Sequence, residues 1–152
     1  MTAGGDSSAP PASEVWERAR FRWGDEPDRV CPATIDVTGP ARVLLFGPYV
    51  PLPPGLWRAE IAFDLCEQGA RRTYLVEFGA GADLSRQWSS RLRPGRNTIC
   101  VEHNFEASAI AEIRLWVARA AFHGGLRFLG ATVLWERQRA DEGLMSATPR
   151  LA

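Results

Sequence analysis

The chain has 152 residues, of which 45% are hydrophobic and 24% charged, a composition that suits one globular domain large enough to fold without disulfides or metals. Eighteen basic residues, all of them arginine, balance eighteen acidic ones, so the composition does not support nucleic-acid binding. No stretch approaches the roughly 20 apolar residues that a membrane-spanning helix needs, and no membrane span is expected.

The chain divides into three parts by composition. Residues 1–13 are rich in Ala, Gly, Ser and Pro and lack the basic start and apolar stretch of a secretory signal, which predicts a disordered lead-in and a cytoplasmic protein. Residues 14–138 carry the apolar alternation of a β-sandwich domain. Residues 139–152 lose it and are predicted to be a loose C-terminal tail.

Short segments that alternate in polarity follow one another along the central part. The clearest is residues 57–65, where apolar and polar side chains alternate over nine positions. Strands are predicted at 30–37, 42–46, 57–65, 73–79, 84–90, 97–105, 110–118 and 126–136, with 15–23 as either a strand or a short helix. Eight or nine short strands predict an all-β, antiparallel, jelly-roll-like β-sandwich.

The connections between these segments have turn chemistry. Residues 51–55, with three prolines and a glycine, predict a turn, and the two PxxP patterns within 48–54 are interpreted as a structural crossover rather than a polyproline ligand. Residues 79–83, Gly-Ala-Gly-Ala-Asp, predict a hairpin turn and not a phosphate loop, because no helix follows.

The three cysteines, Cys31, Cys66 and Cys100, are an odd number without a CxxC spacing. This pattern argues against a disulfide framework and against a zinc site, and favours free thiols in a reducing compartment. No metal and no cofactor is predicted.

The usual catalytic motifs are absent from the sequence, including HExxH, GxSxG and a Walker loop. His103 falls on the apolar face of its segment, which favours a buried, hydrogen-bonded histidine over a general base. His123 stands beside Gly124 and Gly125 in a predicted turn. A pair of carboxylates for glycoside hydrolysis stays open, although the acidic residues alternate with arginines along strand faces. The chain is therefore predicted not to be an enzyme.

A candidate ligand site comes from Trp116, which shares the outward face of its strand with Glu112 and Arg114. A pyranose packs its C–H face on an aromatic ring while its hydroxyls take hydrogen bonds from charged side chains. The alternative is that Trp116 packs under a loop or under the N-terminal segment. Trp88, close to Arg86, has the same two interpretations.

Two further residues, Glu102 and Asn104, belong to the candidate site if their strand lies beside that of Trp116. Whether these strands are adjacent is not determined by the sequence.

Residues 46–59, FGPYVPLPPGLWRA, resemble the GPY-x-x-L-x-x-G-x-Y-x opening of bacterial β-sandwich modules that accompany glycosyltransferases and methyltransferases in polysaccharide synthesis. Residues 111–117 resemble the closing E-F-R strand of these modules, and the likeness covers about residues 40–136. It implies a jelly-roll, carbohydrate-binding-like fold and matches only Glu112 and Arg114 among the site residues. Trp57 replaces the usual tyrosine. Residues 128–133 lack an Asp often present in sugar-binding sandwiches, which puts a calcium or sugar role of that strand in doubt.

Three hypotheses follow. The leading one is non-catalytic binding of a glycan or polysaccharide, associated with polysaccharide synthesis or modification, at Glu112, Arg114, Trp116, Glu102, Asn104 and Trp88. The alternative is a structural domain that docks a glycosyltransferase or other partner through the same aromatic and arginine side chains. The third, a small hydrolase, requires two carboxylates facing each other across a cleft.

Overall fold

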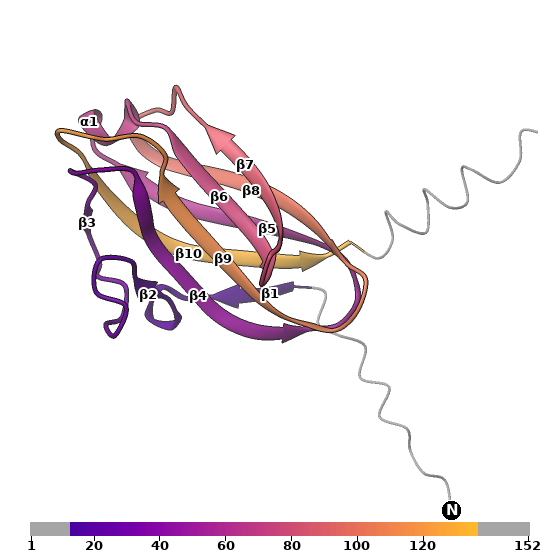
Figure 1. Cartoon of the computed structure of the whole chain (residues 1–152). Helices are drawn as coiled ribbons and strands as arrows, with labels where there is room; N and C mark the ends of the chain where they lie inside the picture. Colours follow the sequence, from indigo (N-terminus) through magenta and orange to yellow (C-terminus); the bar gives the residue numbers. More distant parts are fainter. Residues whose placement is uncertain (1–12, 137–152) are drawn as a thin grey trace, which may run out of the picture.

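Two antiparallel sheets packed face to face make up the domain, and Figure 1 shows them one behind the other. The computed structural model describes residues 13–136, and these confirm the predicted all-β sandwich. The predicted tail lies outside the described residues. So does the predicted lead-in, except that the first strand already begins at Ser13.

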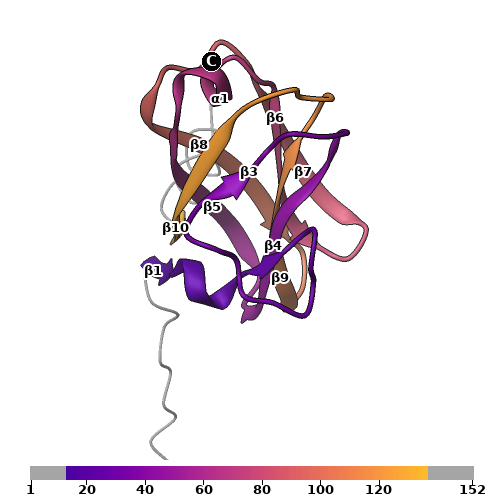
Figure 2. The same ribbon diagram turned by 90° about the vertical axis from the view of Figure 1, so that its left-hand side faces the viewer.

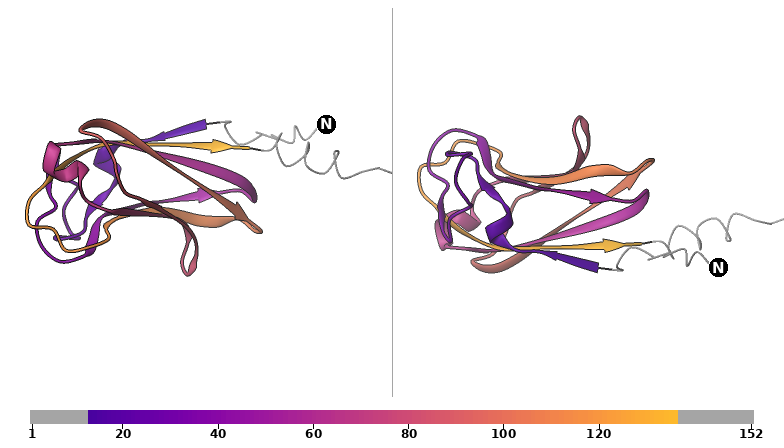
Figure 3. Two further views of the ribbon diagram at one scale, coloured as in Figure 1. Left: turned by 90° about the horizontal axis from the view of Figure 1, so that it is seen from above. Right: turned by 90° about the horizontal axis from the view of Figure 1, so that it is seen from below.

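One sheet, called sheet A, has the strand order β1–β10–β5–β8, with β3 also paired to β10. Its strands are β1 (Ser13–Trp16), β3 (Ile35–Asp36), β5 (Gly55–Leu65), β8 (Gly95–Phe105) and β10 (Gly125–Trp135). The other, sheet B, has the order β2–β4–β9–β6–β7. Its strands are β2 (Arg22–Trp23), β4 (Arg42–Leu52), β6 (Tyr74–Ala80), β7 (Asp83–Ser89) and β9 (Ala109–Val117). Seen from above and below, the sheets form two layers with β1 and β10 together in one of them (Figure 3).

The core fills the space between the layers and follows from the alternation of each strand. In β5, Trp57, Ala59, Ile61 and Phe63 are fully buried, whereas the residues between them face outward. The indole of Trp57 stacks on Trp135 with the ring centroids 6.1 Å apart, and its Nε1–H donates to the Pro53 carbonyl. Strand periodicity therefore places the inward set correctly.

Strand β4 extends six residues beyond its predicted end at 46 and includes Pro48 and Pro51. Prolines are tolerated there because β2 covers β4 only at Leu45 and Phe46, so the rest of that edge needs no ladder donors. Register shifts between Val43 and Leu45 and between Pro48 and Val50 bend the strand. After β4 the chain crosses from sheet B to β5 in sheet A, as the interpretation of residues 48–54 as a crossover predicts.

The N-terminal part differs from the prediction in detail. Segment 15–23 is neither one strand nor one helix: β1 is followed by a 3-10 turn, η1 (Arg18–Arg20), and then by β2. Within 30–37 only β3 is strand, because Pro32 lacks the donor that a ladder requires. One helical turn, α1 (Glu67–Ala70), follows β5, and Figure 2 shows it and β3 from the side.

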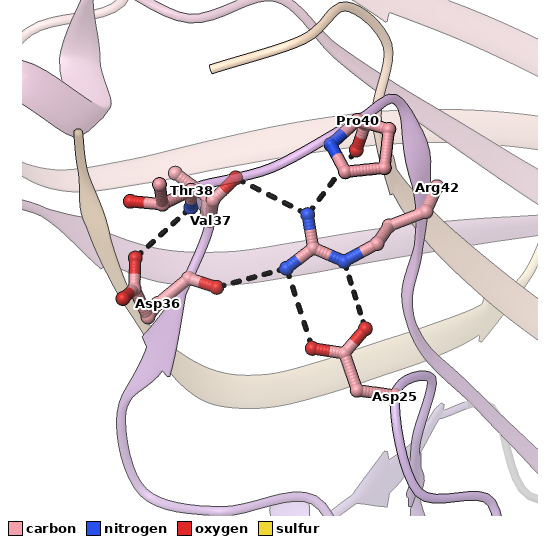
Figure 4. Close-up of polar contacts among 6 residues, drawn as sticks. All are labelled: Asp25, Asp36, Val37, Thr38, Pro40 and Arg42. Atoms are coloured by element: carbon pink, nitrogen blue, oxygen red, sulfur yellow. Dashed lines mark hydrogen bonds and ion pairs between the residues drawn. The ribbon is translucent and has the colours of Figure 1, made fainter. Parts of the chain in front are cut away.

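Arg42 ties the loops before β4 to the body of the sandwich (Figure 4). Its Nε donates to Asp25 Oδ1 at 2.7 Å and its Nη2 to Asp25 Oδ2 at 3.3 Å. The remaining N–H groups reach the backbone carbonyls of Asp36, Val37 and Pro40 at 3.1 to 3.3 Å. All five donors of the guanidinium are thus used, and this orders the segment that leads into Ala41, at one end of the site described next.

Candidate functional site

The outward side of sheet B combines two tryptophans with charged side chains, and this surface is here called the tryptophan face. It consists of the outward residues of three neighbouring strands. These are Glu112, Arg114 and Trp116 of β9, Leu75, Glu77 and Gly79 of β6, and Leu84, Arg86 and Trp88 of β7. Trp116, Leu75 and Trp88 are register partners and form one row across the strands. Arg114, Glu77 and Arg86 form a parallel second row.

Glu77 is the centre of the polar contacts on this face. Its Oε1 accepts the indole N–H of Trp116 and its Oε2 accepts Arg86 Nε at 2.8 Å. Only 4% of Glu77 is exposed although the residue points away from the core, because Trp116 and Arg86 lie against it. A carboxylate in this position fixes the plane of the indole, while most of Trp88, at 58% exposure, stays open to solvent.

A hollow of about 340 Å³ lies over these strands. Its lining combines both indoles with Leu75, Glu77 and Arg86, and it also includes Ala41, Val117 and Ala118. Trp116 is partly exposed and borders this hollow, so no loop within residues 13–136 covers it completely, whereas Glu112 and Arg114 lie on the face outside the lining of the hollow. Two indoles and Leu75 beside a charged pair suit a sugar ring.

The second carboxylate of the face, Glu112, lies further along β9 and is 3% exposed. Its Oε1 accepts Arg114 Nη2 at 2.8 Å. Tyr49, the extra residue of a bulge in β4, has a φ of 65° and lies beside it, with its ring 6.4 Å from that of Phe46. Burial, and next the charge of Glu112, raise the pKa of Tyr49. Aromatic side chains thus extend the face toward β4.

The structure brings together four of the six predicted site residues: Glu112, Arg114, Trp116 and Trp88. The expectation that Glu102 and Asn104 lie beside them is wrong. Both belong to β8, which pairs with β5 in sheet A, and they point out from the opposite side of the sandwich. The sequence allowed the error because chain order places β8 directly before β9, whereas the chain crosses between sheets there.

Several residues of the face were missed, namely Leu75, Glu77, Arg86 and Tyr49. The alternation of segment 73–79 already assigns Leu75 and Glu77 to the side opposite Tyr74, Val76 and Phe78. What the sequence lacks is the pairing of β6 with β9, which converts two separate outward faces into one site.

His103 confirms the expectation of a buried, hydrogen-bonded histidine. It is 5% exposed, its Nδ1 lies 2.8 Å from Ser85 Oγ, and its Nε2 lies 3.2 Å from Asp83 Oδ2. The ring packs against Phe78 and Phe105, with centroids 6.3 and 4.7 Å away. Although Ser, His and Asp occur together, the imidazole is buried, and the group joins the edge strands β7 and β8 of the two sheets.

The arrangement required for a hydrolase is not found on the tryptophan face. Glu77 and Glu112 lie on the same sheet surface rather than across a cleft, and each holds an arginine N–H at 2.8 Å. A glycosidase needs one free, protonated carboxyl group beside an ionised one. Among residues 13–136, no group of three His, Cys, Asp or Glu side chains is placed to hold a metal ion.

All three cysteines lie in the described part of the chain and are free, Cys31 buried and Cys66 and Cys100 exposed, as the count predicted. Between residues 13 and 136, no helix has the length and apolar character needed to cross a membrane.

No protein-family model and no curated protein matches the sequence. Solved structures match the fold. A family 61 carbohydrate-binding module in complex with β-1,4-galactotriose has a TM-score of 0.52 and 12% identity, over 79% of this chain and 91% of the module. The family 6 module of a marine laminarinase from Zobellia galactanivorans has a TM-score of 0.45 and 7% identity, over 80% of this chain and 98% of the module. The family 35 module of Cellvibrio japonicus Abf62 has a TM-score of 0.43 and 12% identity, over 80% of this chain and 92% of the module. The match to the family 61 module shows that the chain has a β-sandwich fold like that of this module.

Proposed function

We propose that this protein is a non-catalytic carbohydrate-binding module and that its glycan site is the tryptophan face. One observation carries the proposal: Trp116 points outward on β9, is held in plane by Glu77, and borders a hollow that also contains Trp88 and Arg86. A partly exposed aromatic plate beside hydrogen-bonding charged groups matches the two sides of a pyranose ring. The likeness in fold to a module that holds β-1,4-galactotriose supports the same proposal.

The alternative, docking of a partner protein, would use the same tryptophan and arginine side chains. The concave shape of the surface favours the sugar. A protein hot spot of this composition is expected to be an apolar patch with a polar rim, whereas here the buried Glu77 and the half-exposed Arg86 stand inside the hollow. Charged groups inside a concavity are suited to hydroxyl groups, which both donate and accept hydrogen bonds.

We further propose that the module works in the cytoplasm in polysaccharide synthesis or modification, in association with a glycosyltransferase. This step rests on the resemblance of residues 46–59 to modules of that kind. Co-purification with the tagged protein from the source cells tests it: recovery of a glycosyltransferase supports this context, and recovery of secreted hydrolases alone contradicts it.

The binding proposal is tested by calorimetric titration with galacto-, xylo-, gluco- and manno-oligosaccharides, using wild type, Trp116→Ala and Arg114→Ala. Wild type is expected to bind at least one series saturably, with modest affinity because the site is shallow and wet. Each variant should weaken binding by about tenfold or more, a loss of about 1.4 kcal/mol.

Arg58→Ala is the matched control. Arg58 is a partly exposed arginine on the outer side of sheet A, so its removal should leave binding unchanged. Circular dichroism and thermal unfolding check that every variant folds. Absence of binding by the wild type to every oligosaccharide of the panel, or equal weakening of binding by Arg58→Ala, would contradict the proposal.

A further inference from the structure

Two parallel rows of side chains run across the strands of sheet B. The first is apolar and joins register partners on β4, β9, β6 and β7, in the order Val43, Trp116, Leu75 and Trp88. The second is mostly polar and runs two residues along, in the order Phe46, Arg114, Glu77 and Arg86. The face is therefore a strip at right angles to the strands, with an apolar side and a polar side.

The strip is longer, measured across the strands, than one sugar ring. Trp116 and Trp88 are separated by one intervening strand, so their Cα atoms lie about 9.5 Å apart. A pyranose ring is about as long as one strand spacing, so a ring stacked on Trp116 leaves Trp88 uncovered. Leu75 stands between the two indoles in the row, is only 8% exposed and lines the hollow, whose space a second ring can occupy.

The charges of the strip cancel within it. On β9, β6 and β7 the outward side chains include two arginines and two glutamates, and each glutamate holds one arginine N–H at 2.8 Å. Beyond them, Arg22 on β2 donates to the Asp28 carbonyl at the far edge. An anionic ligand would meet arginines whose charge is already neutralised and two carboxylates that repel it. Hydroxyl groups fit an alternation of donors and acceptors better, since they serve as both.

Building on the proposed function, we propose that the tryptophan face binds an uncharged, linear glycan of at least three residues laid across the strands from β9 to β7. The first ring stacks on Trp116, the second lies over Leu75 and the third stacks on Trp88. The hydroxyls along one edge of this chain contact Arg114 and Arg86, the latter held in place by the buried Glu77. Trp88 acts here as the far plate of the site and contributes only to ligands that reach it.

Calorimetry with glucose and β-1,4-gluco-oligosaccharides of two to six residues, and with the matching xylose and galactose series, tests the length. Affinity should rise steeply up to three residues and change little beyond. Trp88→Ala should weaken trisaccharide binding by about tenfold and leave monosaccharide binding unchanged, while Trp88→Phe, which keeps a plate, should restore most of the loss.

The charge is tested with β-1,4-linked glucuronic acid oligosaccharides, which differ from the glucose series only by a carboxylate at C6. They should bind at least about tenfold more weakly than the glucose series at equal length if that series binds. A monosaccharide that binds as tightly as the trisaccharide, equal weakening of all lengths by Trp88→Ala, or preference for the acidic series would overturn this inference and leave sugar binding standing. Absence of binding by every series would overturn both proposals.

Discussion

Both outer surfaces of the sandwich carry an ion pair between an arginine and a glutamate, but the two pairs differ in how deeply the glutamate is buried. Sheet A presents Arg58 and Glu60 at 3.1 Å, with 38% and 35% of the side chains exposed. Sheet B presents Arg86 and Glu77 at 2.8 Å, but the glutamate side chain is only 5% exposed. The first pair is an ordinary solvated ion pair worth little to stability. In the second pair an indole shields the carboxylate, so that the same residue types become a fixed, shaped surface.

The comparison shows that alternation of Arg and Glu along a strand does not reveal a site by itself. Sheet B differs because aromatic side chains stand in the adjacent row and cover the carboxylates. Within residues 13–136, no tryptophan of sheet A stands outward beside this ion pair, since Trp16 and Trp57 are buried in the core and Trp135 packs against it.

The largest expected difference between the two surfaces is in the loss of stability caused by Glu77→Ala and by Glu60→Ala. Removal of Glu77 leaves the Trp116 N–H and the Arg86 guanidinium without their acceptor and should lower the free energy of unfolding by about 3 kcal/mol. Glu60→Ala should cost at most about 0.5 kcal/mol. Urea unfolding measures both, and equal losses would show that the two faces are energetically alike.

Two buried groups in the core between the sheets should make the stability of the protein decrease at alkaline pH. Burial raises the pKa of the Cys31 thiol to about 11 from an ordinary value of 9.0, and burial also raises the pKa of Tyr74. Both groups hold their protons more tightly when folded, so the stability they contribute is complete below about pH 9 and declines as the pH rises above it.

By about pH 11 the loss from Cys31 alone should approach about 2 kcal/mol. Denaturant unfolding at a series of pH values measures it, with Cys31→Ala as the control that should flatten the slope. An unchanged slope in this variant would assign the alkaline loss to other groups.

A finer test is Trp116→Phe, which keeps an aromatic plate but removes the N–H that Glu77 accepts. Stability should fall by about 1 kcal/mol, the worth of one hydrogen bond, and sugar affinity should stay within about threefold of wild type. Calorimetry and thermal unfolding measure the two quantities. A loss of affinity as large as that of Trp116→Ala would mean that the indole N–H, and not the plate, holds the ligand.

The smallest expected effect concerns the thiols. Hydrogen bonds from the backbone N–H groups of Gly125 and Gly69 lower the pKa of the exposed Cys66, whereas the Cys31 thiol is buried. Maleimide at neutral pH should therefore alkylate Cys66 and leave Cys31 intact. Cys100 lies on the outer side of sheet A, so its alkylation should not change sugar binding, and mass spectrometry with calorimetry checks both. Reduced binding after labelling of Cys100 would contradict a site confined to sheet B.

Much of the sandwich could be predicted from the sequence because period-two alternation directly reports which side chains of a strand face the core. It placed Trp57 inside and Trp116 outside, next to Glu112 and Arg114. Pairing between strands is a long-range property that no local pattern carries. The sequence therefore could not join Trp88 and Glu77 to Trp116, and it wrongly allowed Glu102 beside them. Strand β4 was predicted too short because its prolines are disfavoured in a ladder, and only the small extent of β2 makes them acceptable.

The pairing of β1 with β10 has a practical consequence for handling the protein. Ser13 and Leu134 are register partners, so the two ends of the described chain leave side by side from sheet A, in the layer opposite the tryptophan face. A tag fused directly to Ser13 or to Glu136 would therefore start in the layer opposite Trp116 and Trp88, and it should leave the strip accessible to long polysaccharides.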